Sequence, residues 1–251
     1  MGKRHDAIGI KQVTRLEWYD YALDMLLSDQ PPKEIRTQLD DFISERLQSG
    51  GFGERGAQTY TKAVTQIMKS WITPARELLE FRDAALDYAR TTKTDSRLTL
   101  HWAVTIAAYP FWHQVAHQVG RLLNLQEVIT QGQIRTRCFE SMGERTTVER
   151  SSRRVIRSFV AWKVLEDTDE KGCYKKVAPL FVSEPKLAVI LLEAALHAHE
   201  TGYSELKALM NSPSLFPFQL PPMTGDAIAQ INDRTEVNRY GLDEEIIKIK
   251  G

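Results

Sequence analysis

Apolar residues recur at three- and four-residue steps through the first half of this chain, and this spacing constrains the fold more than any other feature of the sequence. The first run starts at Leu16 and Tyr19, behind Thr14, which we expect to be the N-cap of a helix. Pro74 should kink or divide a later helical run. Residues 98–108 are apolar on nearly every side, which is typical of a helix at the centre of a bundle. The spacing therefore predicts a mainly α fold.

The composition is that of a folded globular protein. Of 251 residues, 42% are hydrophobic and 26% are charged, and 33 basic residues balance 33 acidic ones. A formal charge of zero argues against a uniformly basic nucleic-acid binder but does not describe how the charge is distributed. Without a run of about 18 apolar residues or the apolar core of a signal peptide, we expect a cytoplasmic protein that does not enter a membrane. Cys138 and Cys173 are expected to be reduced thiols.

The character of the sequence changes along the chain, and three segments are predicted. Residues 1–105 are expected to form a helical N-terminal domain, residues 106–182 a second domain, and residues 183–251 a helix followed by a small module. Ser183, Glu184 and Pro185 should begin the helix of the third segment. Four prolines between Ser212 and Pro222 predict a stretch without regular structure, held to a core by its aromatic side chains.

The stretch from Thr146 to Leu165 predicts an amphipathic helix with arginines on one face. Thr146 and Glu149 have the spacing of a capping box. At 100° per residue, a buried face is formed by Val148, Val155, Phe159 and Trp162. The opposite arc, between about 140° and 240° from Val148, holds Arg150, Arg153, Arg154 and Arg157. From Gln133 to Lys163, seven arginines and one lysine stand against three glutamates, a net charge of +5 in a neutral chain.

The neighbours of this arginine helix extend the pattern. A shorter helix is predicted over 129–142 with Gly143 as the turn, and two short β-capable runs follow on either side of 169–172. Three helices from Phe111 followed by a hairpin resemble the winged-helix fold, over about residues 111–182. The resemblance implies that the helix over 146–165 is a recognition helix and that the turn over 166–176 is a wing.

The winged-helix resemblance implies double-stranded DNA as the partner. Arginine suits that role, because its planar fork pairs with guanine edges or grips phosphate. The residues expected to contact DNA are Arg145, Thr147, Arg150, Ser151, Arg153, Arg154, Arg157, Lys175 and Lys176. Two other interpretations stay open, namely that the arginine face binds an acidic protein and that it is a solvated surface.

The last 50 residues fit the same template. Helices are predicted over 203–211 and 224–232, followed by a hairpin over 236–250 whose turn is formed by residues 239–242. The contact face of this second winged-helix-like module would hold Arg234, Arg239 and a few lysines among several acidic residues. A packing or dimer role and a DNA role are both open for it.

A helical N-terminal region that leads into winged-helix modules, with a helix of serines and arginines, resembles the BrxA component of bacterial BREX phage-defence systems. The resemblance implies a non-enzymatic, DNA-binding accessory subunit of a multi-protein system. Two alternatives are an adaptor subunit that docks protein partners and a dimeric transcriptional regulator.

Catalytic motifs were sought in the sequence. His113 and His117 have the spacing of paired metal ligands, but the glutamate of the HExxH motif is missing between them. Asp167, Glu184 and Lys186 could be arranged as the acid and lysine set of a metal-dependent nuclease, but Pro185 favours a helix start over the strand that such a site needs. We therefore expect no catalytic residues, no metal and no cofactor.

Overall fold

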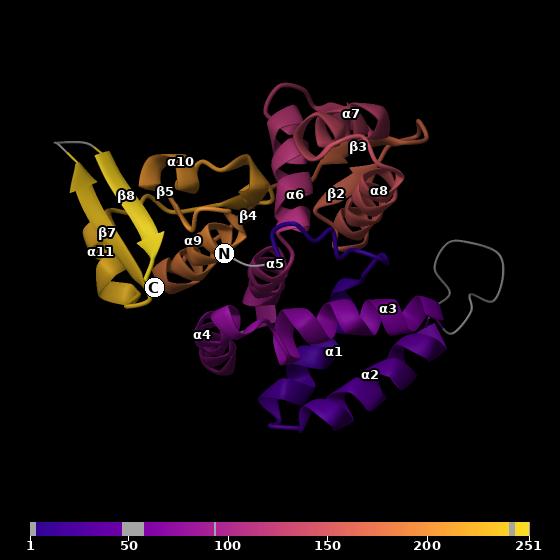
Figure 1. The fold of residues 1–251 in the computed structure, drawn as a ribbon, viewed down its shortest axis with the longest axis horizontal. Helices are drawn as coiled ribbons and strands as arrows, with labels where there is room; N and C mark the ends of the chain where they lie inside the picture. Colours follow the sequence, from indigo (N-terminus) through magenta and orange to yellow (C-terminus); the bar gives the residue numbers. More distant parts are fainter. Residues whose placement is uncertain (1–3, 47–57, 93, 241–243, 251) are drawn as a thin grey trace.

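The computed structural model describes residues 4–46, 58–92, 94–240 and 244–250. In these ranges the fold is mainly helical with small sheets (Figure 1). The α-helices are α1 (Leu16–Leu27), α2 (Pro32–Arg46), α3 (Gln58–Ile67), α4 (Leu79–Thr91), α5 (Arg97–Ala108), α6 (Pro110–Leu123), α7 (Gln131–Met142), α8 (Thr146–Ala161), α9 (Pro185–Ala198), α10 (Leu206–Met210) and α11 (Gly225–Ile231). The strands are β1 (Val128–Thr130), β2 (Leu165–Asp167), β3 (Cys173–Lys176), β4 (Leu180–Phe181), β5 (Tyr203–Glu205), β6 (Phe218–Gln219), β7 (Thr235–Tyr240) and β8 (Glu244–Ile249). No helix in these ranges has the length and hydropathy needed to span a bilayer.

The helices of the N-terminal region confirm the predicted spacing. Pro74 divides the run as expected, since it lies between a π-helical turn over Met68–Ile72 and a 3₁₀ turn over Arg76–Leu78. Thr14, however, does not cap α1, and that prediction was wrong. The N-cap of α1 is Arg15, without a side-chain cap, while the backbone N–H of Thr14 donates to the Ser158 hydroxyl at 3.0 Å.

Helix α5 lies at the centre of the molecule, as its apolar composition predicted. Every residue from Thr99 to Ala107 is buried, and the helix packs against α9, α6 and α1. A single cluster of buried apolar side chains runs from Ile10 to Ile247 and includes residues from all three predicted segments. The predicted boundary at 105 lies within this central helix.

Aromatic side chains fill the space where α5, α6 and α8 meet. The indole of Trp102 contacts those of Trp112 and Trp162, with ring centroids 6.4 Å and 6.3 Å away. Phe216 and Phe218, from the proline-containing stretch, each lie 5.6 Å from Trp102, which confirms that aromatic residues hold this stretch to the core. The stretch is not wholly irregular, because it contains a 3₁₀ turn over Pro213–Leu215 and strand β6.

The segment from α6 to β3 has the order helix, strand, helix, helix, hairpin. Its antiparallel sheet has the order β1-β3-β2, with Ile129 opposite Tyr174 and Glu166 opposite Lys175. The hairpin was predicted, but strand β1 was not, because residues 129–130 were assigned to the helix that follows.

The ends of α7 and α8 differ from prediction. The capping box belongs to α7, where the Thr130 hydroxyl and the Gln133 side chain each bond the other's backbone N–H. Thr146 is instead the first residue of α8, whose N-cap is Arg145 without a side-chain cap, so the predicted capping box was wrong. Helix α8 ends at Ala161 and not at 165, because Lys163 adopts a positive φ of 58° and leads into β2.

The C-terminal segment repeats the order of the central one. Helix α9, strand β5, helices α10 and α11 and the hairpin β7–β8 follow one another, and their sheet has the order β5-β8-β7. Helix α9 begins at Pro185 as predicted, and the hairpin is also confirmed. The predicted helix over 203–211 begins as strand β5, and part of the predicted turn, residues 241–242, lies outside the described residues.

Candidate nucleic-acid interface

Helix α8 has one buried and one exposed face, at the positions that its sequence predicted. The buried side chains are Val148, Ser151, Ser152, Val155, Ile156, Ser158 and Phe159. Arg150, Arg153 and Arg157 are exposed, and Arg154 is half-buried at the edge of the exposed face. The four arginines thus share one side of the helix, and we call them the arginine face.

Three members of the arginine face lack a counter-charge in the part of the chain that the structure describes. Among the described residues, Arg150, Arg153 and Arg154 have no acidic side chain within ion-pair distance. Partial burial, together with the positive charges of Arg153 and Arg150, lowers the pKa of Arg154. The mutual repulsion of these arginines would be relieved by an external anion.

Arg157 is in a different electrostatic environment. Its guanidinium donates to the Asp167 carboxylate on β2 at 2.6 Å. Although partial burial disfavours the charge, the hydrogen bond and ion pair with Asp167 raise the pKa of Arg157. This contact connects α8 to the hairpin and makes Arg157 less available to an external anion than the other three.

Of the remaining residues predicted on α8 and before it, two are accessible and one is not. Thr147 is exposed in the first turn of α8. Arg145 is also exposed, but its guanidinium donates to the carbonyl of Met142, the last residue of α7, at 2.9 Å. Ser151 is only 4% exposed, and its hydroxyl donates to the carbonyl of Ile10 at 2.8 Å. Ser151 is therefore beneath the surface and is not placed to contact a partner.

The hairpin β2–β3 holds the two predicted lysines. Lys175 is exposed but pairs with Glu166 on the neighbouring strand at 3.0 Å, whereas Lys176 is exposed beside a surface depression of about 590 Å³. Between 166 and 176 the hairpin has four acidic residues against three lysines, a net charge of −1. The positive charge of this region is thus concentrated on α8.

A depression of about 870 Å³ lies between α7 and the start of α8. Arg135 pairs with Glu149 across it at 3.5 Å, and Arg137 pairs with Glu140 on α7 at 3.3 Å. These arginines are neutralised within the protein, so the depression is much less positive than the arginine face beside it.

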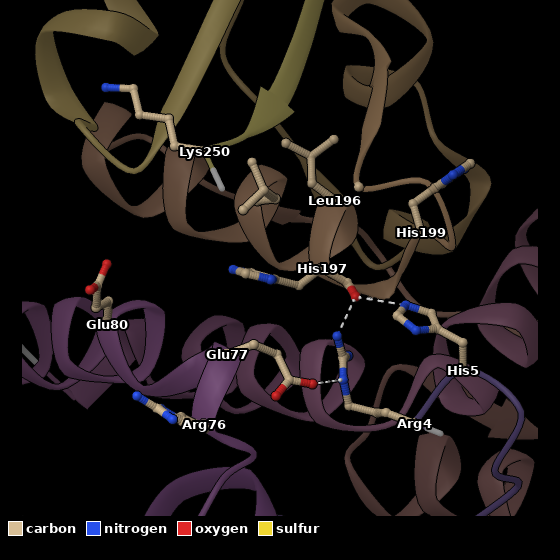
Figure 2. Close-up of a pocket in the computed structure, with 11 residues that line it drawn as sticks. Arg4, His5, Arg76, Glu77, Glu80, Leu196, His197, His199 and Lys250 are labelled. Atoms are coloured by element: carbon tan, nitrogen blue, oxygen red, sulfur yellow. Dashed lines mark hydrogen bonds and ion pairs between the residues drawn. The ribbon is translucent and has the colours of Figure 1, made fainter. Parts of the chain in front are cut away.

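A cavity of about 520 Å³ lies where residues 4–5, the start of α4, the end of α9 and strand β8 meet (Figure 2). Arg4 donates to Glu77 at 3.2 Å, to the carbonyl of His197 at 3.0 Å and to the carbonyl of Ala107. Burial, opposed by the hydrogen bond to Glu77, lowers the pKa of Arg4. Its guanidinium joins the 3₁₀ turn over Arg76–Leu78 to α5 and α9, so we interpret Arg4 as structural.

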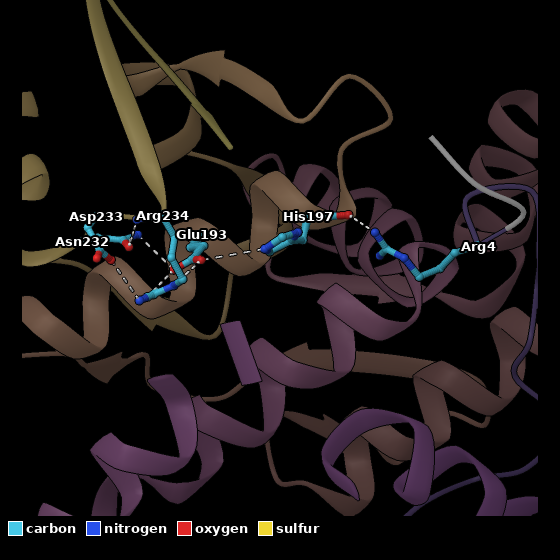
Figure 3. Close-up of polar contacts among 6 residues, drawn as sticks. All are labelled: Arg4, Glu193, His197, Asn232, Asp233 and Arg234. Carbon is cyan, nitrogen blue, oxygen red and sulfur yellow. Dashed lines mark hydrogen bonds and ion pairs between the residues drawn. The ribbon is translucent and has the colours of Figure 1, made fainter. Parts of the chain in front are cut away.

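A second network extends from the same end of α9 to the C-terminal module (Figure 3). The buried Glu193 carboxylate accepts two hydrogen bonds from Arg234, at 2.9 and 2.8 Å, and one from Asn232 at 2.9 Å. Although burial disfavours its charge, the contacts with His197 and Arg234 lower the pKa of Glu193. This network fixes α9 to the segment between α11 and β7.

Of the two histidines of α6, His113 lies in the interior and His117 is half-buried. His113 is 7% exposed, and its ring lies 6.5 Å from that of His199. Burial, with smaller effects from His117 and His199, lowers the pKa of His113 to about 3. Within the described ranges, no three or more His, Cys, Asp or Glu side chains are grouped so that they could hold a metal ion.

The chain was compared with protein-family models, with curated proteins and with solved structures, and none of the three comparisons gave a match. The assignment of a site therefore depends on the geometry of the residues themselves. In that geometry the arginine face is a cluster of positive charges, three of which have no acidic partner among the described residues.

The contacts beneath and beside the arginine face were not predicted from the sequence. Residues 8–15 form a segment without regular secondary structure, which we call the strap, and it lies along α8 with hydrogen bonds to Ser151 and Ser158. Ser151 and Ser158 were the available signal, because their spacing of seven residues places both on one edge of α8. Ser151 was predicted to contact DNA, whereas no role was predicted for Ser158.

Proposed function

We propose that this protein binds double-stranded DNA through the arginine face of α8, within a winged-helix module formed by residues 110–176. This segment contains three helices followed by a hairpin, and this order is the basis of the resemblance to the winged-helix fold. Arg150, Arg153 and Arg154 would contact the duplex first, because their charges lack an acidic partner among the described residues. This unpaired cluster is the observation that carries the proposal.

The proposed contacts are mainly electrostatic. Each arginine that neutralises a phosphate releases a condensed counterion, so the affinity should fall steeply as salt rises. Arg157 and Lys175 would contribute less, because each already pairs with an acidic residue of the hairpin. The proposed binding requires no catalytic step, and a place as an accessory subunit of a defence system follows from the resemblance to BrxA alone.

Fluorescence anisotropy with a labelled duplex of about three helical turns tests the proposal. Affinity is measured from about 50 to 200 mM salt for the wild type and for the R150A/R153A/R154A variant. The slope of log affinity against log salt should become shallower by about 0.9 for each arginine that contacts a phosphate. A variant with the same loss of charge outside this module, R36A/R76A/K207A, should bind like the wild type.

Two outcomes would overturn the proposal. One is that the wild type fails to bind the duplex even at the lowest salt concentration. The other is that both triple variants bind with the same affinity and salt slope. Circular dichroism of each variant establishes that the fold is retained, which we expect because the substituted side chains are exposed or, for Arg154, at the edge of the exposed face.

A further inference from the structure

The strap is held to α3 by a single glutamine. The buried side-chain carbonyl of Gln66 accepts the backbone N–H of Lys11 at 3.0 Å and that of Gln12 at 2.9 Å. Two consecutive backbone groups are thus bound to one side chain. The strap therefore has a fixed position beside α3.

The strap is held to α8 by two serines. Ser151 donates to the carbonyl of Ile10, and the Ser158 hydroxyl accepts the N–H of Thr14 at 3.0 Å. Ile10 thus lies beside the earlier part of α8 and Thr14 beside the later part, so the strap runs along the helix. The hydrogen bonds on both sides place the strap in the seam between α3 and α8, where Figure 1 shows the indigo segment crossing.

The strap has a buried and an exposed side. Ile10, Gln12 and Thr14 are buried, whereas Lys11 is exposed. Since the seam has the core beneath it, the exposed edges of α3 and α8 on either side of the strap face the same solvent. On α8 this edge is occupied by Arg154, which lies about 40° to 60° from Ser151 and Ser158 around the helix.

On the α3 side the corresponding edge is occupied by lysines. Lys62 lies about 40° from Gln66 around α3, on the side away from the buried Ala63 and Ile67. Lys69 lies in the π-helical turn over Met68–Ile72 that continues α3. Both lysines are exposed, and among the described residues neither they nor Lys11 have an ion-pair partner. The exposed cations therefore continue from α8 over the strap to α3, whereas on the other side of α8 Arg157 meets the net negative hairpin.

We propose that Lys11, Lys62 and Lys69 extend the DNA-binding surface, so that the sugar-phosphate backbone of a duplex held by α8 crosses the strap onto α3. This inference rests on the proposed function. Lysine ammonium groups on flexible stems contact phosphates as point charges and read no sequence. The N-terminal helical region, outside the winged-helix module, would thus supply part of the affinity without changing sequence preference.

The variant K11A/K62A/K69A tests the inference in the same anisotropy assay. Its salt slope should be shallower than that of the wild type by about 0.9 for each lysine that contacts a phosphate. The matched control K33A/K186A/K207A removes three exposed lysines from other elements and should keep the wild-type slope. A K11R/K62R/K69R variant retains the charge and should also keep it, which separates loss of charge from any change in the fold.

The outcomes distinguish this inference from the proposed function. If R150A/R153A/R154A loses affinity and salt slope while K11A/K62A/K69A binds like its control, the extended surface is wrong and the function of α8 stands. If the wild type binds no duplex, the proposed function fails and the extension fails with it. The extended DNA-binding surface is supported if the salt slope is shallower for K11A/K62A/K69A but unchanged for K11R/K62R/K69R.

Discussion

The hydroxyl of Ser151 donates to the carbonyl of Ile10 at 2.8 Å, although 141 residues of chain separate the two. A serine on the arginine helix thus faces inward and binds the strap. The orientation of the arginine face consequently depends on a segment from the start of the chain. Residues 106–182 expressed alone would lack this support.

Ser151→Ala should destabilise the protein by about 1–3 kcal/mol, because the buried Ile10 carbonyl loses its hydrogen-bond donor. Urea denaturation measures the change. Ser152→Ala is the matched control, because the Ser152 hydroxyl donates to the Glu149 carbonyl within α8 and joins no second element. Ser152→Ala should lower the free energy of unfolding by less than Ser151→Ala does. Equal decreases for the two variants would contradict a stabilising role for the hydrogen bond between Ser151 and the strap.

Asp167→Asn should strengthen DNA binding. The substitution removes the carboxylate that pairs with Arg157 at 2.6 Å and frees that guanidinium for a phosphate. The salt slope should become steeper by up to about 0.9. Asp41→Asn, which makes the same charge change on an exposed position of α2, should leave the slope unaltered. Identical slopes for the two variants would exclude Arg157 from the interface.

Gly120→Ala should destabilise the fold by about 1–3 kcal/mol or more. A Cβ at this position of α6 would lie 1.9 Å from the carbonyl oxygen of Pro213, which is backbone and cannot rotate away. Gly132→Ala in α7 is the control, since its Cβ would meet no atom closer than 3.7 Å. Thermal unfolding compares the two, and a stable Gly120→Ala protein would show that residues 213–216 do not pack as closely as described.

The stability of the protein should fall with acidification because of His113. Its pKa is about 3 in the folded protein, against an ordinary value of 6.5. Between these values the unfolded chain binds a proton that the folded protein does not. The contribution of neutral His113 to the free energy of unfolding is thus fully present above pH 6.5. It is lost as the pH falls toward 3, by up to about 1.4 kcal/mol for each pH unit.

Denaturant unfolding of wild type and His113→Gln across this range tests the pH prediction. The variant should lose less stability on acidification, because glutamine does not titrate. Some dependence will remain, since burial and the nearby Arg121 charge also lower the pKa of His117. Parallel curves for the two proteins would show that His113 does not contribute to acid sensitivity.

Arg234→Ala should lower the free energy of unfolding by about 2–3 kcal/mol, because it removes the bidentate partner of the buried Glu193 carboxylate. The figure is below that for a fully buried pair, since the Arg234 side chain is 23% exposed. The exposed pair of Arg90 with Asp29 provides a control, and Arg90→Ala should cost no more than about 1 kcal/mol. Equal unfolding midpoints for the two variants would contradict this assignment of the Glu193 network.

The sequence by itself determined the helical architecture and the arginine face. The position of a side chain around a helix depends on its spacing from its neighbours, so Arg150, Arg153 and Arg157 were placed correctly opposite Val155. The hairpin over 165–176 was also predictable, because its turn chemistry and β-type residues are local. Such features need no knowledge of distant parts of the chain.

The tertiary structure decided which polar residues beside the arginines are accessible. Ser151 and Arg154 lie about 60° apart on α8, and the strap covers the first while it leaves the second at the surface. Similarly, Thr130 and Thr146 both precede a potential capping partner, but the strand that ends at Thr130 fixes the geometry of the cap there. Contacts between residues far apart in the chain produce no periodic pattern in the sequence. The burial of Ser151 and the position of the strap could therefore be seen only in the folded structure.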